Sequence, residues 1–265
     1  MGPATPLGVA VSRGRFRNAT LLAGLITLLA CARPEAAERY ALVVSGASGG
    51  EAYAQKYAEW RQALVSLLRD RFGYPADHLV TLAEVEADGA RMATREQVRQ
   101  ALTSLVARVT VDDQLLIVLI GHGTAVDGDD AKFNLVGPDL AASDWAALLK
   151  PLRGRLVFVD TTSASVPFVR HLSGPRRVVM AATDAVPQQF ETVFAGFFIR
   201  AFDDGAADLD RNGRVSIWEA FTSASAGVRT WFEQHGQLPT ERAVIDDDGD
   251  GIGRDAQSPG VDGQL

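Results

Sequence analysis

The sequence predicts an α/β protein with three layers, built on a doubly wound, mostly parallel sheet with helices on both faces. Three observations predict it: apolar segments of strand length alternate with helical stripes, the strongest of these segments are apolar throughout, and the composition is globular. The 265 residues are 47% hydrophobic and 22% charged, with 25 Gly and 11 Pro. That balance excludes collagen-like, low-complexity and disordered chains, and the length is enough to bury a substantial core.

The first half of the chain shows this alternation. Tyr40–Ser45 is an apolar, β-branched segment that predicts a strand, and the glycine-rich stretch Gly46–Gly50 predicts the turn after it. A helix is expected next, ending before Gly73, because apolar residues recur every three or four positions. These residues are Tyr53, Tyr57, Trp60, Leu64, Leu68 and Phe72. His78–Leu82 predicts a second strand.

The remaining elements follow the same pattern. Thr94 and Gln97 form a capping box that begins a second long helix. Leu115–Ile120 is apolar throughout and predicts a strand covered on both faces. We expect Ser143 to cap a short helix, and residues 156–159 and 178–182 to form two more buried strands. The tail from residue 246 is rich in Asp and Gly and is expected to be irregular.

The N-terminus is typical of an export signal covering residues 1–32. Three arginines precede the apolar stretch Ala19–Ala30, which has the length of a signal peptide core and is too short to span a bilayer comfortably. The segment ending in Cys31 resembles a bacterial lipobox, in which Cys31 would be acylated; a plain signal cleavage after Ala32 is the competing interpretation. We therefore expect an exported protein, either periplasmic or anchored outside the cytoplasm through a lipid on Cys31.

Charge and cysteine content narrow the possible partners. Residues 1–31 carry three Arg and no acidic residue, so the exported chain has 23 basic and 33 acidic side chains, a net charge of −10. Such a protein is a poor candidate for nucleic-acid binding. Cys31 is the only cysteine, so neither an intramolecular disulfide nor a cysteine-based metal site is possible. Contact with a membrane is expected only through a lipid on Cys31, and the oligomeric state is left open.

Polar residues follow two of the predicted central strands, where parallel sheets place their ligand-binding crevices. Leu115–Ile120 runs into Gly121-His122-Gly123, and the strand over residues 156–159 runs into Asp160–Ser165, a cluster rich in hydroxyl groups. A His framed by glycines can act as a base, and a hydroxyl group on the next strand is a natural nucleophile.

At these two strand ends the chain resembles the caspase-like fold of cysteine peptidases, most closely its legumain-like and metacaspase-like branches. In those families an apolar strand ends in His-Gly and the next one ends in Asp-x-Cys. The resemblance spans residues 39–235 and implies a caspase-like domain over residues 39–203. His122-Gly123 matches the catalytic His-Gly, and Asp160–Ser165 stands where metacaspase-like members have Asp-Ser-Cys-His-Ser-Gly, so Thr162 occupies the nucleophile position.

The resemblance also implies roles for neighbouring residues. In metacaspase-like relatives that select basic residues, the acid aligned with Asp160 binds substrate, so Asp160 is expected either to line the pocket floor or to cap the following turn. Segments 133–139 and 173–183 resemble exported bacterial proteins of this group that carry Thr-Ser-Ala-Ser at the same site.

The missing cysteine determines what function to expect. A thiol beside a His is partly ionised near neutral pH, whereas a hydroxyl is not. Peptidases that use Thr usually activate it with its own terminal amine, and Thr162 lies mid-chain. The leading hypothesis is a pseudo-peptidase that binds a peptide or protein at the strand-end crevice. The alternative is an active hydrolase that uses Thr162 or Ser163 as the nucleophile and His122 as the base.

A second hydrolase signal lies at Gly46–Gly50, which matches the G-x-S-x-G pattern between a strand and a helix. The pattern follows the first strand, and no His lies at a plausible strand end after Asp160, so a glycine turn that begins the helix is favoured. The same glycines do not fit the dinucleotide-binding pattern, and no phosphate-binding loop motif occurs.

Residues 208–219 match an EF-hand calcium loop at its informative positions. The expected ligands are the side chains of Asp208, Asp210, Asn212, Ser216 and Glu219 and the carbonyl of Arg214. We expect helices on both sides of the loop, the first carrying Phe190, Phe194 and Phe197. A Ca²⁺ ion here would join the C-terminal helix, in a segment over residues 204–265, to the rest of the domain.

A second, weaker match begins at Asp246. Asp246, Asp248 and Asp250 repeat the opening of the calcium loop, but Gln257 stands in place of the closing Glu. This segment is either a weaker calcium loop or a solvated acidic tail.

Overall fold

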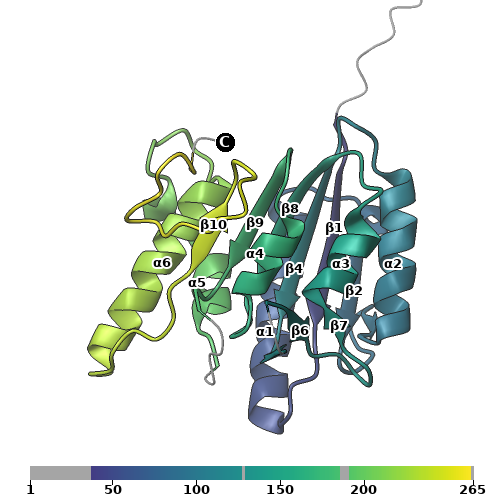
Figure 1. Ribbon diagram of the computed structural model, residues 1–265, viewed down its shortest axis with the longest axis horizontal. Helices are drawn as coiled ribbons and strands as arrows, with labels where there is room; N and C mark the ends of the chain where they lie inside the picture. The colour runs from purple at the N-terminus through teal and green to yellow at the C-terminus, as the bar shows by residue number, and fades with distance from the viewer. Residues whose placement is uncertain (1–36, 127–128, 186–190, 264–265) are drawn as a thin grey trace, which may run out of the picture. The chain divides into compact units, whose positions relative to one another are not determined.

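The computed structural model describes residues 37–126, 129–185 and 191–263 (Figure 1). The apolar segments form a seven-stranded sheet in the order β10-β9-β8-β4-β1-β2-β3, in which every pairing is parallel except that of β10 with β9. The strands are β1 (Arg39–Ser45), β2 (Leu79–Ala83), β3 (Arg91–Met92), β4 (Gln114–Ile120), β8 (Arg155–Asp160), β9 (Arg177–Ala181) and β10 (Val244–Asp246). The predicted α/β class with a mostly parallel sheet is confirmed.

Helices cover both faces of this sheet because its strands are apolar on both sides. One face packs against α2 (Arg95–Arg108), α3 (Ala142–Leu149) and α4 (Val166–Leu172), of which α3 and α4 lie toward the viewer in Figure 1. The opposite face packs against α1 (Glu51–Ser66), α5 (Phe194–Ala201) and α6 (Ile217–Gln234). Short helical turns follow α1 at Leu67–Arg71 and lie at Ala76–His78 and Gly205–Ala207.

Successive residues of each central strand belong to opposite halves of the core. In β4, Ile117 packs toward α2, α3 and α4, whereas its neighbour Val118 packs toward α1, α5 and α6. Both side chains are buried, as the continuous apolar run predicts for a central parallel strand. β1, β4 and β8 are central strands of this doubly covered sheet, and the polar residues indicated by the sequence follow the ends of β4 and β8.

A small antiparallel sheet begins directly after His122. It consists of β5 (Gly123–Ala125), β6 (Ala131–Phe133) and β7 (Leu140–Ala141), in that order. The backbone amide of Asn134 donates to the carbonyl of His122 over 3.0 Å. The position of His122 is therefore set by the end of β4 on one side and by this sheet on the other.

Three local predictions differ from the structure. The second strand begins at Leu79, because Ala76–His78 form a 3-10 turn. Ser143 does not cap α3: the helix begins at Ala142, and the Ser143 hydroxyl donates to Asp130 over 2.6 Å. The tail is not irregular from its start, because Val244–Asp246 forms β10 along the edge of the sheet.

The predicted signal segment over residues 1–32, with Cys31, lies outside the described residues, as does Phe190. Export and lipid anchoring stay predictions from the sequence. The described residues group as one compact unit. No helix within the described part of the chain has the length and apolarity needed to cross a membrane.

The glycine turn after β1 is required by packing. Gly46 donates its amide to the carbonyl of Ile120, and a Cβ at this position would lie 2.2 Å from the carbonyl oxygen of Asn134. A Cβ at Gly50, by contrast, would meet nothing within 4 Å. Glycine is required at position 46 because the Asn134 backbone, which follows β6, leaves no room for a Cβ.

Gly46→Ala is expected to lower the free energy of unfolding by roughly 2 kcal/mol or more, because the Asn134 backbone must move. Gly50→Ala, at the N-cap of α1, is the matched control; it meets no neighbouring atom and is expected to cost less, about 0.5–1 kcal/mol, because Ala is a poorer N-cap residue than Gly. Urea denaturation of both variants measures the difference. Equal stabilities would contradict the packing explanation.

Candidate functional site

His122 lies just beyond the end of β4, at the point where the strand order reverses. The sheet runs from β1 to β2 on one side and from β1 to β4 on the other, so the crevice between β1 and β4 is its topological switch point. The imidazole Nε2 of His122 lies 3.0 Å from the carbonyl oxygen of Ser48. Because a carbonyl only accepts hydrogen bonds, Nε2 carries a hydrogen in this arrangement.

Two tyrosines of α1 hold the ring of His122. The ring of Tyr53 meets it edge-on with centroids 4.9 Å apart, and the hydroxyl of Tyr57 lies 3.2 Å from Nε2. Burial raises the pKa of Tyr57, with further contributions from Glu191 and Tyr53, so its hydroxyl stays protonated at neutral pH. His122 is half-buried and faces α1 and the turn after β1.

Thr162 lies beyond the end of β8, and its side chain is completely buried. A Cβ added to Gly123 would lie 2.5 Å from the Thr162 Oγ1 and 3.1 Å from its Cβ. The Thr162 side chain thus packs directly against the Gly123 backbone. Among the described residues, its hydroxyl has no hydrogen-bond partner. The structure brings Thr162 against Gly123 but does not bring its hydroxyl into hydrogen bonding with His122.

Asp160 is fully buried, and its Oδ1 accepts a hydrogen bond from the Thr162 amide over 2.9 Å. Its Oδ2 has no hydrogen-bond partner within the described chain. Burial raises the pKa of Asp160 to about 7, although the amide of Thr162 and its nearby hydroxyl both oppose this rise. Of its two expected roles, the contacts match capping of the turn, because a buried carboxylate has no face toward solvent.

The hydroxyl groups around Thr162 join the ends of neighbouring strands. Thr161 donates to the Leu119 carbonyl over 2.7 Å, which links β8 to β4. Ser165 accepts a hydrogen bond from the Thr183 amide over 3.1 Å, which links it to the segment after β9. Ser163 is only 7% exposed, and its carbonyl accepts from the Thr183 hydroxyl. The cluster that the sequence indicated as a source of nucleophiles is a buried network at the strand ends.

Nucleophilic catalysis needs a hydroxyl group within hydrogen-bonding reach of its base and amides that face the developing oxyanion. Here the Thr162 hydroxyl is buried against Gly123, and its amide donates to Asp160. Ser48 of the G-x-S-x-G match is also buried, and its carbonyl rather than its hydroxyl contacts His122. Neither hydroxyl has the geometry of an activated nucleophile.

The first acidic loop brings oxygen ligands together between α5 and α6. One carboxylate oxygen from each of Asp208, Asp210 and Glu219 lies within 4.8 Å of the others, a separation that fits Ca–O bonds of about 2.4 Å. Gly213 has a φ of 82°, and its amide donates to Asp208. The hydroxyl of Ser216 accepts from the Glu219 amide and so caps α6.

Backbone hydrogen bonds hold the side chains of Glu219 and Asn212 in this loop. The Oε1 of Glu219 accepts from the amides of Leu209 and Asp210, which draws the carboxylate across the start of the loop. Asn212 accepts from the amide of Arg214 over 2.8 Å. Oxygen donors of this type suit a hard cation, so the residues fit Ca²⁺.

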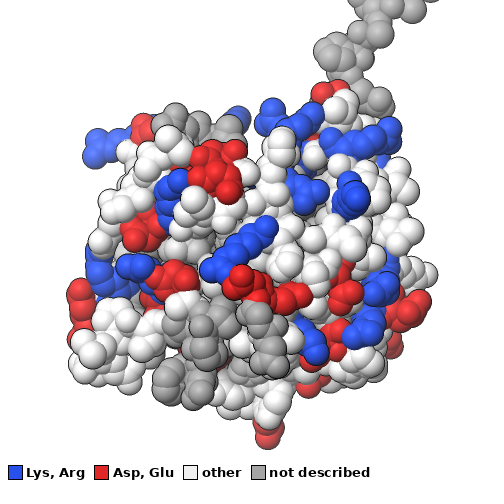
Figure 2. Space-filling model, in the orientation of Figure 1, with Lys and Arg blue, Asp and Glu red and all other residues white. Residues whose placement is uncertain are grey.

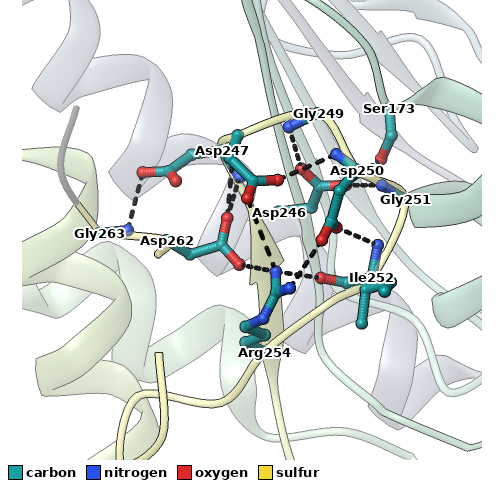
Figure 3. A network of polar contacts seen from close by, with 11 residues as sticks. Ser173, Asp246, Asp247, Gly249, Asp250, Gly251, Ile252, Arg254, Asp262 and Gly263 are labelled. Atoms are coloured by element: carbon teal, nitrogen blue, oxygen red, sulfur yellow. Dashed lines mark hydrogen bonds and ion pairs between the residues drawn. The ribbon is translucent and has the colours of Figure 1, made fainter. Parts of the chain in front are cut away.

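The second acidic loop has the same backbone arrangement, with a closing residue that the sequence did not indicate (Figure 3). Gly251, like Gly213, has a positive φ, and its amide donates to the first Asp of the loop, Asp246. The side chain of Asp262 accepts from the amides of Asp247 and Asp248, the same two positions that Glu219 engages in the first loop. Asp262 therefore stands in the place of the missing Glu.

A basic side chain already lies among the carboxylates of this second loop. The guanidinium of Arg254 contacts Asp262 over 2.7 Å and Asp250 over 2.6 Å, and it donates to the Ile252 carbonyl. Asp262 has a fully buried side chain, so this pair is only weakly screened by solvent. Arg254 and Asp262 are the two residues of this region that sequence reasoning missed.

Comparison with solved structures identifies the fold. The chain superposes on the crystal structure of the Drosophila initiator caspase Dronc with a TM-score of 0.52 and 14% sequence identity, over 94% of this chain and 95% of that chain. It superposes on protein GSU0716 from Geobacter sulfurreducens with a TM-score of 0.50 and 14% identity, over 82% of this chain and 97% of that one. The fold is therefore caspase-like, as the sequence motifs implied.

Sequence comparisons add no family assignment. No protein family model matches the chain, and no curated protein matches it. At 14% identity the two structural relatives show the shared fold alone.

The buried carboxyl group of Asp160 predicts a specific dependence of stability on pH. Its pKa rises from 3.8 to about 7 on folding, so the folded chain holds this proton more tightly. The associated stability is fully present below about pH 4 and is lost as the pH rises through 7; the full loss is roughly 4 kcal/mol.

Asp160→Asn is expected to flatten this decline, measured as the free energy of unfolding in urea at intervals from pH 4 to 8. A residual decline is expected from Glu241, whose pKa is also raised to about 7 by burial. The exposed Asp112→Asn is the control that leaves the decline unchanged. A profile of Asp160→Asn that coincides with that of the unsubstituted protein would contradict the prediction.

Proposed function

We propose that this protein is a pseudo-peptidase, a caspase-like domain that binds a peptide or protein partner at the carboxyl edge of its sheet without cleaving it. The observation that carries the proposal is the position of Thr162. Its hydroxyl is buried and lacks a hydrogen-bond partner among the described residues, and its amide donates to Asp160 rather than toward a bound substrate.

Two features support ligand binding at this edge. The half-buried His122 lies at the topological switch point, and Tyr53 beside it is 37% exposed. Aromatic and imidazole side chains at such a crevice are suited to bind a peptide. On the face shown in Figure 2, acidic and basic side chains both occur, and several basic ones gather at the upper right. The net charge of the sequence is −7, which favours a peptide or protein partner over nucleic acid.

A digest of a peptide library by the purified, calcium-loaded protein tests the proposal. We expect no cleavage, and we expect peptides to be retained intact on the protein and lost from His122→Ala. Thr162→Val should fold with equal or higher stability, because it removes a buried hydroxyl without a partner and keeps the side-chain shape.

Cleavage that is abolished by both His122→Ala and Thr162→Val would overturn the proposal in favour of a threonine hydrolase. Cleavage that survives Thr162→Val but is lost in Ser163→Ala would identify Ser163 as the nucleophile. A folded, calcium-loaded protein that neither cleaves nor retains any peptide would also overturn it.

We further propose that the first acidic loop binds one Ca²⁺ ion as a structural staple. The supporting observations are the convergence of Asp208, Asp210 and Glu219 and the position of Glu219 in the first turn of α6. An ion there would tie α6 to the segment that follows α5. Because Arg254 already neutralises carboxylates in the second loop, we expect one tightly bound ion per chain.

Removal of calcium with a chelator is expected to lower the melting temperature, since an ion that binds only the folded chain adds about 2.7 kcal/mol at a hundredfold excess over its Kd. Glu219→Gln should abolish this response, while its amide still completes the capping box of α6. Glu233→Gln, on the exposed side of the same helix, is the control. Calorimetry that detects no heat on adding calcium would contradict the proposed binding of Ca²⁺ at this loop.

A further inference from the structure

A cavity of about 250 Å³ opens beside His122, on the flank away from Thr162. It lies between α1 and the ends of β1 and β2, whereas Thr162 follows β8 on the other side of β4. Ser48 and Tyr57 line the cavity and also contact His122. One liquid water occupies about 30 Å³, so the space suits a small molecule or one amino acid side chain.

Arg61 is the unusual residue of this cavity. It lies on α1, is only 4% exposed, and lines the space together with small apolar residues and the acidic Glu84 and Asp88. Its Nε is buried without a hydrogen-bond partner, and no hydrogen bond joins its guanidinium to any other described residue. Leaving a buried charged donor unsatisfied is costly, so this arrangement indicates a partner that enters from outside.

Asp88 does not supply that partner. Its Oδ2 lies 3.8 Å from the Arg61 Nη2, which is beyond hydrogen-bonding distance, and it already accepts a hydrogen bond from Gln62 over 2.8 Å. Its side chain is 59% exposed, so water weakens the attraction. Arg61 therefore lines the cavity with hydrogen-bond donors that no described residue accepts from, and its one ion pair is the long contact to Asp88.

We propose that this cavity is a binding site for a carboxylate group, held by the guanidinium of Arg61. The planar fork of an arginine matches the two oxygens of a carboxylate, and the low exposure of Arg61 makes such a bond stronger than one at the surface. The carboxylate belongs to a small free acid or to an acidic side chain of a bound peptide. The inference does not depend on whether a ligand also binds near Thr162.

Two pairs of probes test the proposal in the full-length, calcium-loaded protein. The first pair is propionate and propionamide, which have the same shape but differ in charge. The second pair is N-acetylglutamate N-methylamide and its glutamine counterpart, which represent a peptide side chain. Binding is followed by the NMR signals of the His122 ring, because Ser48 and Tyr57 connect that ring to the cavity.

We expect at least one of the two carboxylates to shift the His122 signals in a saturable way, with its amide counterpart at least about tenfold weaker. Binding of propionate alone would assign the site to free acids, and binding of the glutamate derivative would show that a peptide side chain can enter. Arg61→Met should abolish the response, whereas Arg71→Met removes the same charge from an exposed position and should preserve it.

Arg61→Lys provides a second variant that keeps the charge but loses the fork, and it should bind at least about tenfold more weakly. The proposal would be overturned if neither carboxylate shifted the signals, or if the amides bound as tightly as the acids. The comparison of acids with amides uses the unsubstituted protein, so it decides the question even if the Arg61 variants fail to fold. Peptide retention without a carboxylate response would leave the pseudo-peptidase standing and remove only this site.

Discussion

The packing of the Thr162 side chain against the Gly123 backbone is the contact on which the carboxyl edge of the sheet depends. It joins the end of β8 to the chain that leaves β4, and it leaves no room for a Cβ at Gly123. The Asp160 carboxylate holds the amide of the same threonine, so both the side chain and the backbone of Thr162 are engaged in structure. The carboxyl edge of this caspase-like sheet is thereby filled beside β8.

The open part of this edge lies on the other flank of His122. Tyr53, Tyr57 and Ser48 surround the imidazole there, and the cavity with Arg61 adjoins them. The same strand ends thus separate a packed region beside β8 from an accessible region beside β1 and β2. The proposal of recognition without bond cleavage rests on this distribution of buried and accessible groups.

Much of the fold could be predicted from the sequence because central parallel strands are covered on both faces. Leu115–Ile120 is apolar throughout for that reason, and its position indicated β4 and the site after it. The glycines around His122 and the hydroxyl groups after residue 160 likewise indicated the correct strand ends. These are local signals, since each depends on residues that are neighbours in the chain.

Other features depend on distant residues and could not be predicted in this way. Asp262 closes the second acidic loop from outside the spacing of a calcium motif, and Arg254 meets it only through the fold. Arg61 lies outside the apolar stripe that predicted α1, so neither its burial nor its place beside the segment after β2 was indicated. The resemblance to caspase-like peptidases implied a nucleophile position for Thr162. Only the three-dimensional contact shows that its side chain is buried against the Gly123 backbone.

The most direct test of this account is a high-resolution crystal structure of the calcium-loaded protein, in which the distance from the Thr162 Oγ1 to the nearest nitrogen of His122 is measured. The account predicts no hydrogen bond between them, with the hydroxyl buried against Gly123 and the Thr162 amide donating to Asp160. A separation of about 2.6–3.2 Å, with the Thr162 amide free to face a bound ligand, would contradict it and point to an active hydrolase.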